Sequence, residues 1–287
     1  MHLMQIRGQR QAGRDQPAHE LLDAGDGRRL DRFGNRRVDR PAPAAIWPAR
    51  LPESAWAADL RFDRRAGWSG AALDPWTITV QELVFELRPT DAGQLGLFPE
   101  HFGFWQWLRA ALAGRSDPQV LNLFGATGAT TLALAGAGAR VTHVDASRPA
   151  VAWARRNAEL SGLADRPIRW IVDDALTFVE REQRRGRRYD GIVLDPPTFG
   201  HGTRGSRWEL AVALPGLLDA CAAVATDDVF VLLTAHATGL DRDDLGDALM
   251  DAFEPVPGTD VTTETIEQVA TSGAVLPLGA AARMIRG

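Results

Sequence analysis

The sequence predicts an α/β protein whose main domain is a doubly wound parallel sheet, and three observations lead to this class. From about residue 102 onward, short apolar segments alternate with segments of helical periodicity. The apolar segments are nearly continuous, which is typical of parallel strands buried on both faces. Near the C-terminus, residues 262–285 instead contain two extended segments around a Thr-Ser-Gly turn, which predicts an antiparallel hairpin.

The elements of this domain follow one another in the order that a doubly wound sheet requires. A first helix is predicted at residues 102–113. The predicted strands that follow cover residues 120–124, 140–145, 169–172, 190–194 and 229–234. The predicted helices between them cover residues 150–161, 175–184 and 208–224, and the hairpin consists of residues 262–269 and 275–285.

The N-terminal part of the chain lacks this alternation of apolar and helical segments. Residues 1–18 are polar and lack periodicity, so we expect a disordered segment. Residues 19–100 consist of short segments divided by turn dipeptides, with strands predicted at 77–80 and 83–87. We therefore expect a small β-rich domain at 19–100, followed by the α/β domain at 101–287.

Composition excludes several protein classes. An apolar content of 45% with 24% charged residues is ordinary for a globular protein. The chain has no apolar run long enough to cross a membrane and no secretory signal, so a cytoplasmic location is expected. A single cysteine, Cys221, cannot form an internal disulfide, which agrees with a reducing compartment.

Charge is distributed unevenly around a net value of −5. Residues 1–50 carry ten Arg against six acidic residues, whereas residues 111–287 carry seventeen Arg against twenty-three. Enzymes that act on nucleic acids usually have a basic footprint, and only the N-terminal segment offers one here. The charge pattern alone therefore weakens the case for a polynucleotide substrate.

A glycine-containing turn follows the first predicted strand, in Asn122-Leu-Phe-Gly-Ala-Thr-Gly128. Ligands of open α/β sheets bind where the strands end, because backbone N–H groups point outward there. Gly125 and Gly128 would allow close approach of a ligand. Alternatively, the turn needs small residues at these positions for packing alone. The turn does not have the GxGxxG pattern of dinucleotide-binding proteins. The candidate ligand-binding residues here are Asn122, Phe124, Gly125, Ala126, Thr127 and Gly128.

Carboxylates follow the next two predicted strands. Asp145 ends the second strand, in a position suited to accept hydrogen bonds from ribose hydroxyls, and Ser147 is the better candidate to cap the following helix. Asp173 and Asp174 end the third strand, where a carboxylate can bind the amino group of adenine. Capping of the next helix is an equally good role for Asp174. Ala146 and Ala175 complete these two candidate groups.

The sharpest signal is Asp195-Pro196-Pro197-Thr-Phe199 at the end of the fourth predicted strand. Two consecutive prolines prevent continuation of a strand or a helix, so they fix the backbone beside Asp195. A rigid group of acceptor atoms suits an enzyme that holds an amino or ring nitrogen, and Phe199 could stack on a planar base. Asp195, Pro196, Pro197 and Phe199 are therefore the candidate catalytic residues.

Two groups of arginines are candidates for binding the substrate. The segment from Arg181 to Arg188 follows a helix and precedes a strand, which predicts a solvated helix end at the edge of the sheet away from the site. Arg204 and Arg207 lie in a glycine-rich loop directly after the prolines, so they are the candidates for binding a substrate phosphate or carboxylate. His236 is either a base at the mouth of the site or an ordinary loop histidine.

Together these segments resemble the S-adenosylmethionine-dependent methyltransferase family that contains the ribosomal-RNA large-subunit 5-methylcytosine and 7-methylguanine enzymes. The resemblance covers roughly residues 75–287 and rests on blocks in the same order as in the family. The blocks are Gly96-Leu-Phe-Pro-Glu100, Asn122-Leu-Phe-Gly-Ala-Thr-Gly128, Val144-Asp-Ala-Ser147, Trp153-Ala-Arg-Arg-Asn157, Asp174-Ala175, Asp195-Pro-Pro-Thr-Phe199 and Leu276-Pro-Leu-Gly-Ala-Ala281.

The resemblance implies a Rossmann-like methyltransferase sheet with an antiparallel C-terminal hairpin, and S-adenosyl-L-methionine as cofactor. It further implies that Phe98, Pro99 and Glu100 close over the cofactor and that residues 124–128 hold its methionine part. Asp145 would bind the ribose, Asp174 the adenine, and Asp195 with the two prolines would face the substrate. RNA is implied as the substrate by this resemblance alone, although the N-terminal RNA-binding module frequent in the family has no counterpart here.

One departure from the family concerns the chemistry. Methylation of cytosine carbon 5 needs a thiol after the fifth strand, but this position reads Thr234-Ala235-His236. Cys221 lies within a predicted helix, where we expect it to be a small buried residue. We therefore expect transfer to nitrogen, with oxygen as the alternative acceptor, and without a metal. A protein or metabolite substrate, and a non-catalytic cofactor-binding module, are the alternatives, and the oligomeric state stays open, a homodimer included.

Overall fold

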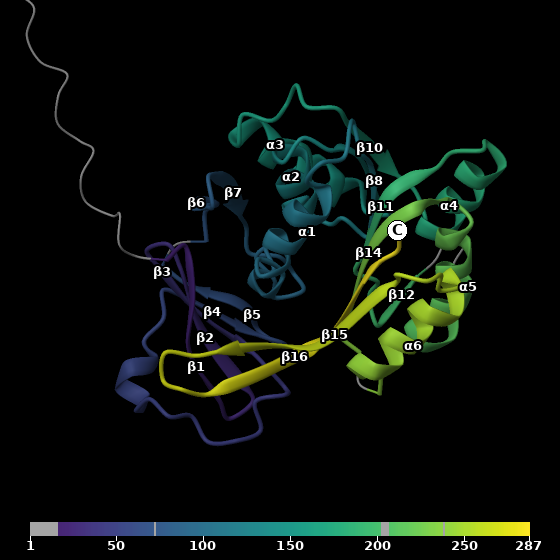
Figure 1. The fold of residues 1–287 in the computed structure, drawn as a ribbon. Helices are drawn as coiled ribbons and strands as arrows, with labels where there is room; N and C mark the ends of the chain where they lie inside the picture. Colours follow the sequence, from purple (N-terminus) through teal and green to yellow (C-terminus); the bar gives the residue numbers. More distant parts are fainter. Residues whose placement is uncertain (1–16, 72, 202–206, 238) are drawn as a thin grey trace, which may run out of the picture.

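The computed structural model describes residues 17–71, 73–201, 207–237 and 239–287 (Figure 1). Its largest element is a seven-stranded sheet with the strand order β10-β9-β8-β11-β14-β16-β15. The strands are β8 (Gln119–Leu123), β9 (Arg140–Asp145), β10 (Ile168–Val172), β11 (Tyr189–Leu194), β14 (Ala225–Ala235), β15 (Asp260–Val269) and β16 (Val275–Ile285). The strands from β10 to β14 pair in parallel, and β16 is antiparallel to both of its neighbours. The predicted parallel sheet with an antiparallel hairpin is thus confirmed.

Helices cover both faces of this sheet, as a doubly wound fold requires. They are α1 (Phe104–Leu112), α2 (Ala129–Gly136), α3 (Arg148–Leu160), α4 (Ala175–Arg184), α5 (Leu210–Ala222) and α6 (Arg242–Phe253). Trp105 and Leu132 belong to a core beneath α1–α3, whereas Phe178, Leu217 and Phe253 belong to a separate core beneath α4–α6. Figure 1 shows these two helical layers on opposite sides of the sheet.

The N-terminal sheet has five strands in the order of the chain, with β3 and β4 parallel and the other neighbours antiparallel. They are β1 (His19–Gly25), β2 (Arg28–Phe33), β3 (Arg36–Pro41), β4 (Leu60–Asp63) and β5 (Gly67–Gly70). A short 3-10 helix, η1 (Glu53–Trp56), lies between β3 and β4. The β-rich character predicted for this part of the chain is therefore present. All but the last two residues of the expected disordered segment 1–18 lie outside the described residues.

A separate hairpin, β6 (Trp76–Val80) and β7 (Leu83–Leu87), joins the two parts of the chain. Glu86 fixes it to α3, because its carbonyl accepts a hydrogen bond from the indole of Trp153 at 2.9 Å and its N–H donates to the side chain of Asn157 at 2.9 Å. This hairpin, which the sequence places in the β-rich domain, therefore packs on the α/β domain.

The tip of the C-terminal hairpin reaches the N-terminal sheet (Figure 1). Backbone N–H groups of Thr271 and Ser272 donate to the carbonyls of Leu21 and Leu22, and the Ser272 hydroxyl lies 2.6 Å from a carboxylate oxygen of Asp23. A small apolar cluster that includes Leu21 and Leu276 seals this contact. The C-terminal hairpin and the N-terminal strand β1 thus hold the two sheets together, with a cavity between the sheets.

Several element boundaries differ from the sequence-based expectation. The helix predicted at 208–224 begins at Leu210, because β13 (Arg207–Glu209) first pairs with β12 (Phe199–His201). The strand predicted at 229–234 begins earlier, at Ala225. Helix α6 was not predicted from the sequence, although Asp241 and Asp244 form a capping box at its start.

Candidate functional site

A cavity of about 670 Å³ lies where the parallel strands end, between the two sheets. Its wall contains Val144 at the end of β9 and Leu276 of the C-terminal hairpin, together with Arg29 and Arg40 of the N-terminal sheet. Most residues predicted as cofactor-binding or catalytic line it. These are Phe98, Pro99, Glu100, Phe124, Ala126, Asp145, Ala146, Ser147, Asp173, Asp174, Ala175, Asp195, Pro196 and Pro197.

The glycine-containing turn forms one end of the cavity with an unusual backbone. Phe124 has φ 55° and Ala126 has φ 47°, both in the left-handed region that residues with a Cβ rarely adopt. Gly125 is required for packing, since a Cβ there would lie 2.4 Å from the ring of His143. Gly128, with φ 88°, is required for the backbone turn into α2. Strain at such positions is typical of ligand-binding loops.

Asn122 and Thr127, although predicted to bind cofactor, have side chains that are buried beneath this turn. The Asn122 amide donates to the Thr131 hydroxyl at 2.7 Å, and Thr131 lies 2.8 Å from Nδ1 of His143. The Thr127 hydroxyl donates to the carbonyl of Gly96, in the loop before Phe98. Both side chains therefore hold the walls of the site together, and they line a smaller adjoining cavity.

Asp145 lies partly buried in the wall, with its carboxylate fixed by backbone groups. One oxygen accepts the N–H of Ala126 at 2.8 Å and the other accepts the N–H of Ser147 at 2.8 Å. A carboxylate offers about four lone-pair positions, so two remain for hydroxyl donors in the cavity. Ser147 caps α3 through the N–H of Ala150, as its position in the sequence predicted.

Asp173 and Asp174 have distinct partners at the end of β10. Asp174 caps α4 by accepting the N–H of Thr177 at 3.0 Å, so the capping role predicted for it is present. Asp173 forms an ion pair with Arg181 at 2.6 Å. Arg181, which the sequence placed with the arginines far from the site, therefore reaches back to a residue of the cavity wall.

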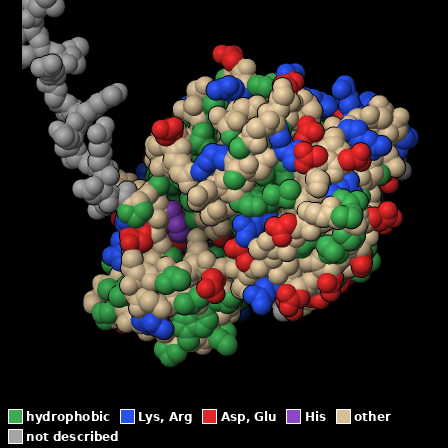
Figure 2. Space-filling view, viewed as in Figure 1, with side chains coloured by type: hydrophobic (Ala, Val, Ile, Leu, Met, Phe, Trp, Pro, Cys, Tyr) green, Lys and Arg blue, Asp and Glu red, His purple; other side chains and the backbone are tan. Residues whose placement is uncertain are grey.

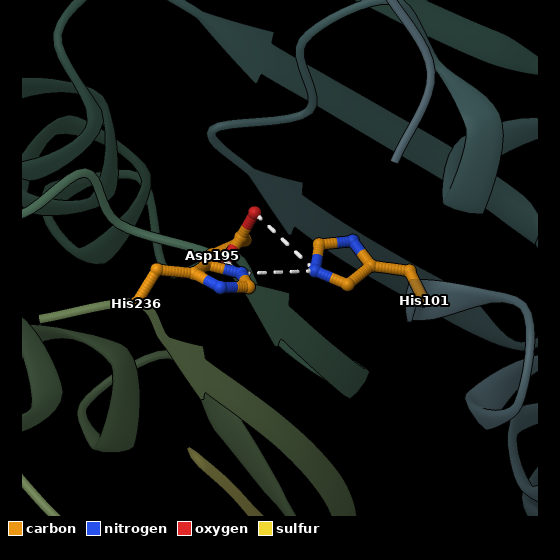
Figure 3. A group of neighbouring side chains, drawn as sticks. All are labelled: His101, Asp195 and His236. Atoms are coloured by element: carbon orange, nitrogen blue, oxygen red, sulfur yellow. Dashed lines mark hydrogen bonds and ion pairs between the residues drawn. The ribbon is translucent and has the colours of Figure 1, made fainter. Parts of the chain in front are cut away.

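Three side chains from separate segments meet beside the prolines (Figure 3). Asp195 follows β11, His236 follows β14, and His101 ends the short 3-10 helix η2 (Pro99–His101). Nε2 of His236 lies 3.3 Å from Oδ1 of Asp195, and Nε2 of His101 lies 3.7 Å from Oδ2. The two Nε2 atoms lie 3.3 Å apart. The Thr234 hydroxyl donates to Oδ1 of Asp195 at 2.6 Å, and Nδ1 of His236 lies 2.6 Å from the carbonyl of Leu278.

Electrostatics in this cluster favour the charged forms. Burial raises the pKa of Asp195, but the charge of His101 and the hydrogen bond with His236 outweigh it and bring the value to about 2. Burial lowers the pKa of His236, but its hydrogen bond with Asp195 and the charge of that carboxylate outweigh it and bring the value to about 9. The sequence left His236 between two roles and did not single out His101, although it directly follows the block 96–100.

The prolines line the cavity as predicted, but the aromatic residue beside them is not the predicted Phe199. Pro196 and Pro197 line the cavity, but the Phe199 side chain is 64% exposed and is not part of the lining. Trp208 takes a place in the wall instead, donating from its indole to the carbonyl of Pro197 at 2.7 Å and packing its ring 5.7 Å from that of Phe124. Stacking by Phe199 thus stays a prediction, and Trp208 was missed.

Arginines of the N-terminal sheet were also missed. Arg29 and Arg40 line the cavity, and both pair with the fully buried Asp31, at 2.7 and 2.9 Å. Burial lowers the pKa of Arg40 despite Asp31. Of the predicted substrate-binding residues, Arg204 lies outside the described residues, and only the backbone of Arg207 is described.

Cys221 and the arginines after α4 lie away from the cavity. Cys221 is fully buried in α5, and burial raises its pKa to about 12, so its thiol is suited to packing. Arg187 and Arg188 line a depression at the opposite edge of the sheet, where the parallel strands begin, together with Arg140 and Arg169.

Comparisons with known proteins agree with this geometry. The sequence profile described as "S-adenosylmethionine-dependent methyltransferase" matches residues 35–218. The crystal structure of a SAM-dependent methyltransferase from Agrobacterium tumefaciens is similar, with a TM-score of 0.87 and 34% identity over 94% of this chain and 91% of that chain. A protein from Streptococcus mutans described as a SAM-dependent methyltransferase shares the fold, with a TM-score of 0.74 and 16% identity over 94% of this chain and 75% of that chain.

Curated relatives are ribosomal RNA methyltransferases that are similar over part of their length. Ribosomal RNA large subunit methyltransferase K/L of Syntrophotalea carbinolica is 40% identical over 116 residues, or 40% of this chain and 15% of that protein. Methyltransferase K of Neisseria meningitidis is 32% identical over 47% of this chain and 38% of that protein. The chain thus matches less than half the length of these relatives. In the part of the chain that the structure describes, no helix is long and apolar enough to cross a membrane.

Proposed function

We propose that this chain, which belongs to the S-adenosylmethionine-dependent methyltransferase family, methylates a nitrogen atom of a planar base in RNA. The observation that carries the proposal is the Asp195 carboxylate, held at the cavity wall by Thr234 and His236 next to two prolines. The curated relatives, which act on ribosomal RNA according to their names, support RNA as the substrate.

The donor and acceptor groups of the cavity suit S-adenosyl-L-methionine. We assign the ribose to Asp145, whose two remaining lone-pair positions can accept two hydroxyl groups. Asp174 uses one carboxylate oxygen for its helix cap, which leaves the other for the amino group of adenine. Residues 98–100 would cover the cofactor, and the turn at 124–128 would hold its methionine part. When bound, the cofactor supplies an electrophilic methyl group.

Asp195 and the carbonyl of Pro196 would hold the acceptor nitrogen by its N–H hydrogens, so that its lone pair points at the methyl carbon. Transfer of the methyl group would release a proton from the acceptor nitrogen, and the Asp195 carboxylate would accept it for passage to water, because His236 already carries its proton. Most of the rate enhancement would come from this positioning, because the sulfonium is a good leaving group and no covalent enzyme intermediate is needed. The buried Cys221 offers no thiol for methylation of a ring carbon.

Anion-binding residues would hold the phosphates on either side of the base. Arg204 and Arg207 follow the prolines in the sequence, and Arg40 lies in the opposite wall of the cavity. Figure 2 shows acidic and basic side chains interspersed over the visible face. The proposal therefore places RNA recognition at the cavity and does not depend on a broad basic surface.

Incubation of the protein with methyl-labelled S-adenosylmethionine and separated RNA, protein and metabolite fractions tests the function. We expect label in RNA, with nucleoside analysis locating it on a base nitrogen. Asp195→Asn should abolish this transfer while cofactor binding, measured by calorimetry, stays near that of the wild type. Label that enters only protein or metabolites would overturn the RNA proposal, and label on C5 of cytosine would overturn nitrogen as the acceptor.

A second experiment locates the substrate. The double variant Arg204→Ala with Arg207→Ala should raise the Michaelis constant for RNA and leave cofactor affinity unchanged. The matched control replaces Arg187 and Arg188, which lie at the opposite edge of the sheet. If only the control pair is needed with a short RNA, the substrate binds at the other face.

A further inference from the structure

The cluster of His101, Asp195 and His236 brings together more lone pairs than donor hydrogens. His236 lies with Nδ1 only 2.6 Å from the carbonyl of Leu278, and a carbonyl can only accept, so Nδ1 carries the hydrogen. In the neutral ring, Nε2 of His236 therefore presents a lone pair. That lone pair faces Nε2 of His101 at 3.3 Å and a carboxylate oxygen of Asp195 at 3.3 Å. The hydrogen of His101, an additional proton or a metal ion can satisfy this lone pair, and only the metal ion would bind all three residues at once.

One ligand atom from each of the three residues lies within 4.8 Å of the other two, which brings all three within reach of one metal ion. Zinc binds imidazole nitrogen and carboxylate oxygen at about 2.0–2.2 Å, so two ligands of a tetrahedral ion lie about 3.3–3.5 Å apart. The two Nε2 atoms are 3.3 Å apart and Nε2 of His236 is 3.3 Å from Oδ1 of Asp195, whereas the 3.7 Å contact of His101 is with the other carboxylate oxygen, Oδ2. Neighbouring ligands of an octahedral ion with similar bonds would be closer, at about 3.0 Å.

The surroundings also resemble those of metal ligands. Histidines that bind metals usually donate their second N–H to a carbonyl or carboxylate, as His236 does to Leu278. The Asp195 carboxylate is oriented by the hydroxyl of Thr234. Because Asp195 and His236 line the large cavity, a fourth ligand can enter from it, as in zinc sites that keep one open position.

We propose that His101, Asp195 and His236 bind one divalent ion of borderline softness, with Zn²⁺ as the ion that fits best. Two imidazoles and one carboxylate match the ligand preference of Zn²⁺, whereas Ca²⁺ and Mg²⁺ prefer oxygen ligands. The ion would bind Asp195 and His236, which the proposed function also uses, but Zn²⁺ binding is measured without the methyl acceptor, so the two proposals can fail separately. An ion here would occupy the lone pairs that otherwise take up the proton of the acceptor.

Calorimetry of the full-length, untagged and chelator-treated protein with ZnCl₂ tests the proposal. We expect one Zn²⁺ per chain with a dissociation constant in the micromolar range or below. His101→Ala and His236→Ala should each weaken binding by at least about a hundredfold, the upper end of what loss of a second-shell partner causes. The matched control is His19→Gln, which removes a histidine of β1 that pairs with Asp31.

Cobalt provides a second readout that does not depend on activity. Co²⁺ bound in a tetrahedral site gives strong visible absorption, which should appear with the wild-type protein and with His19→Gln but not with His236→Ala. Circular dichroism identifies any variant that fails to fold, and Asp195→Asn, which keeps the shape of the side chain, then replaces it. Millimolar or absent Zn²⁺ binding, or binding that survives in the folded variants, would show that these three residues form no metal site.

Discussion

His143 is expected to make the protein sensitive to mild acid, because it is buried without charge beneath the glycine-containing turn. Thr131 accepts the Asn122 amide hydrogen and donates its own to Nδ1 of His143, so the ring carries its hydrogen on Nε2. Nε2 has no hydrogen-bond partner among the described residues. Burial lowers the pKa of this histidine to about 3.

The magnitude follows from the difference between this pKa and that of the unfolded chain. Between the two values, the unfolded state binds a proton that the folded state does not, so the free energy of unfolding decreases as the pH falls. With an unfolded pKa of about 6.5, the loss relative to alkaline pH is about 2 kcal/mol at pH 5 and about 3 kcal/mol at pH 4. The value at pH 5 hardly depends on the folded pKa, provided that it lies well below 5.

Urea denaturation of the wild-type protein and of His143→Gln, each at pH 7.5 and 5.0, measures this contribution. Glutamine can accept the Thr131 hydrogen but does not titrate, and its packing cost against Trp170 is the same at both pH values. The wild type should therefore lose about 2 kcal/mol more than the variant between the two pH values. Equal losses in the two proteins would refute the reasoning, since other titrating groups are common to both.

Three further predictions concern the cofactor, the cysteine and a helix. Asp145→Ala should weaken binding of S-adenosylmethionine by at least about tenfold in calorimetry, or about 1.4 kcal/mol, and wild-type affinity would contradict its assignment to the ribose. Cys221→Ala should methylate normally and lose about 1 kcal/mol of stability in urea, so an inactive but folded variant would restore a role for the thiol. Asp241→Ala should cost about 1 kcal/mol in the same assay because it removes the cap of α6, and an unchanged midpoint would show that the cap contributes nothing.

The sheet and much of the cofactor side of the cavity could be predicted because their signals are local. A buried parallel strand is a short apolar run, and the residue that ends it lies at the edge where ligands bind. Asp145 and Asp195 could therefore be located from sequence position alone, and both line the cavity. Helix α6 was missed although its buried residues Leu245, Leu249 and Phe253 recur at helical spacing and the acidic cap at Asp241 was a usable signal.

The remaining parts of the cavity depend on contacts between distant segments. His101 and His236 are 135 residues apart in the sequence. No local sequence motif links the two histidines to each other or to Asp195. Trp208 enters the wall because its segment pairs with Gly200 as a strand, whereas its local pattern continues the following helix. Such residues become recognisable only when the fold brings their side chains together, since each local pattern has a satisfactory structural explanation.

The arginine-rich N-terminal segment shows why the number of charged residues in a sequence does not reveal the charge of the protein surface. Its excess of Arg over acidic residues suggested a basic surface, but Arg28 pairs with Asp39 at 2.6 Å, and Arg29 and Arg40 share the buried Asp31. Much of this charge therefore acts inside the protein. Glu100, which lines the same cavity, acts together with Asp31 on both guanidinium groups, so their charge is compensated within the protein. The number of arginines in this segment is consequently no measure of the positive charge that it presents to a substrate.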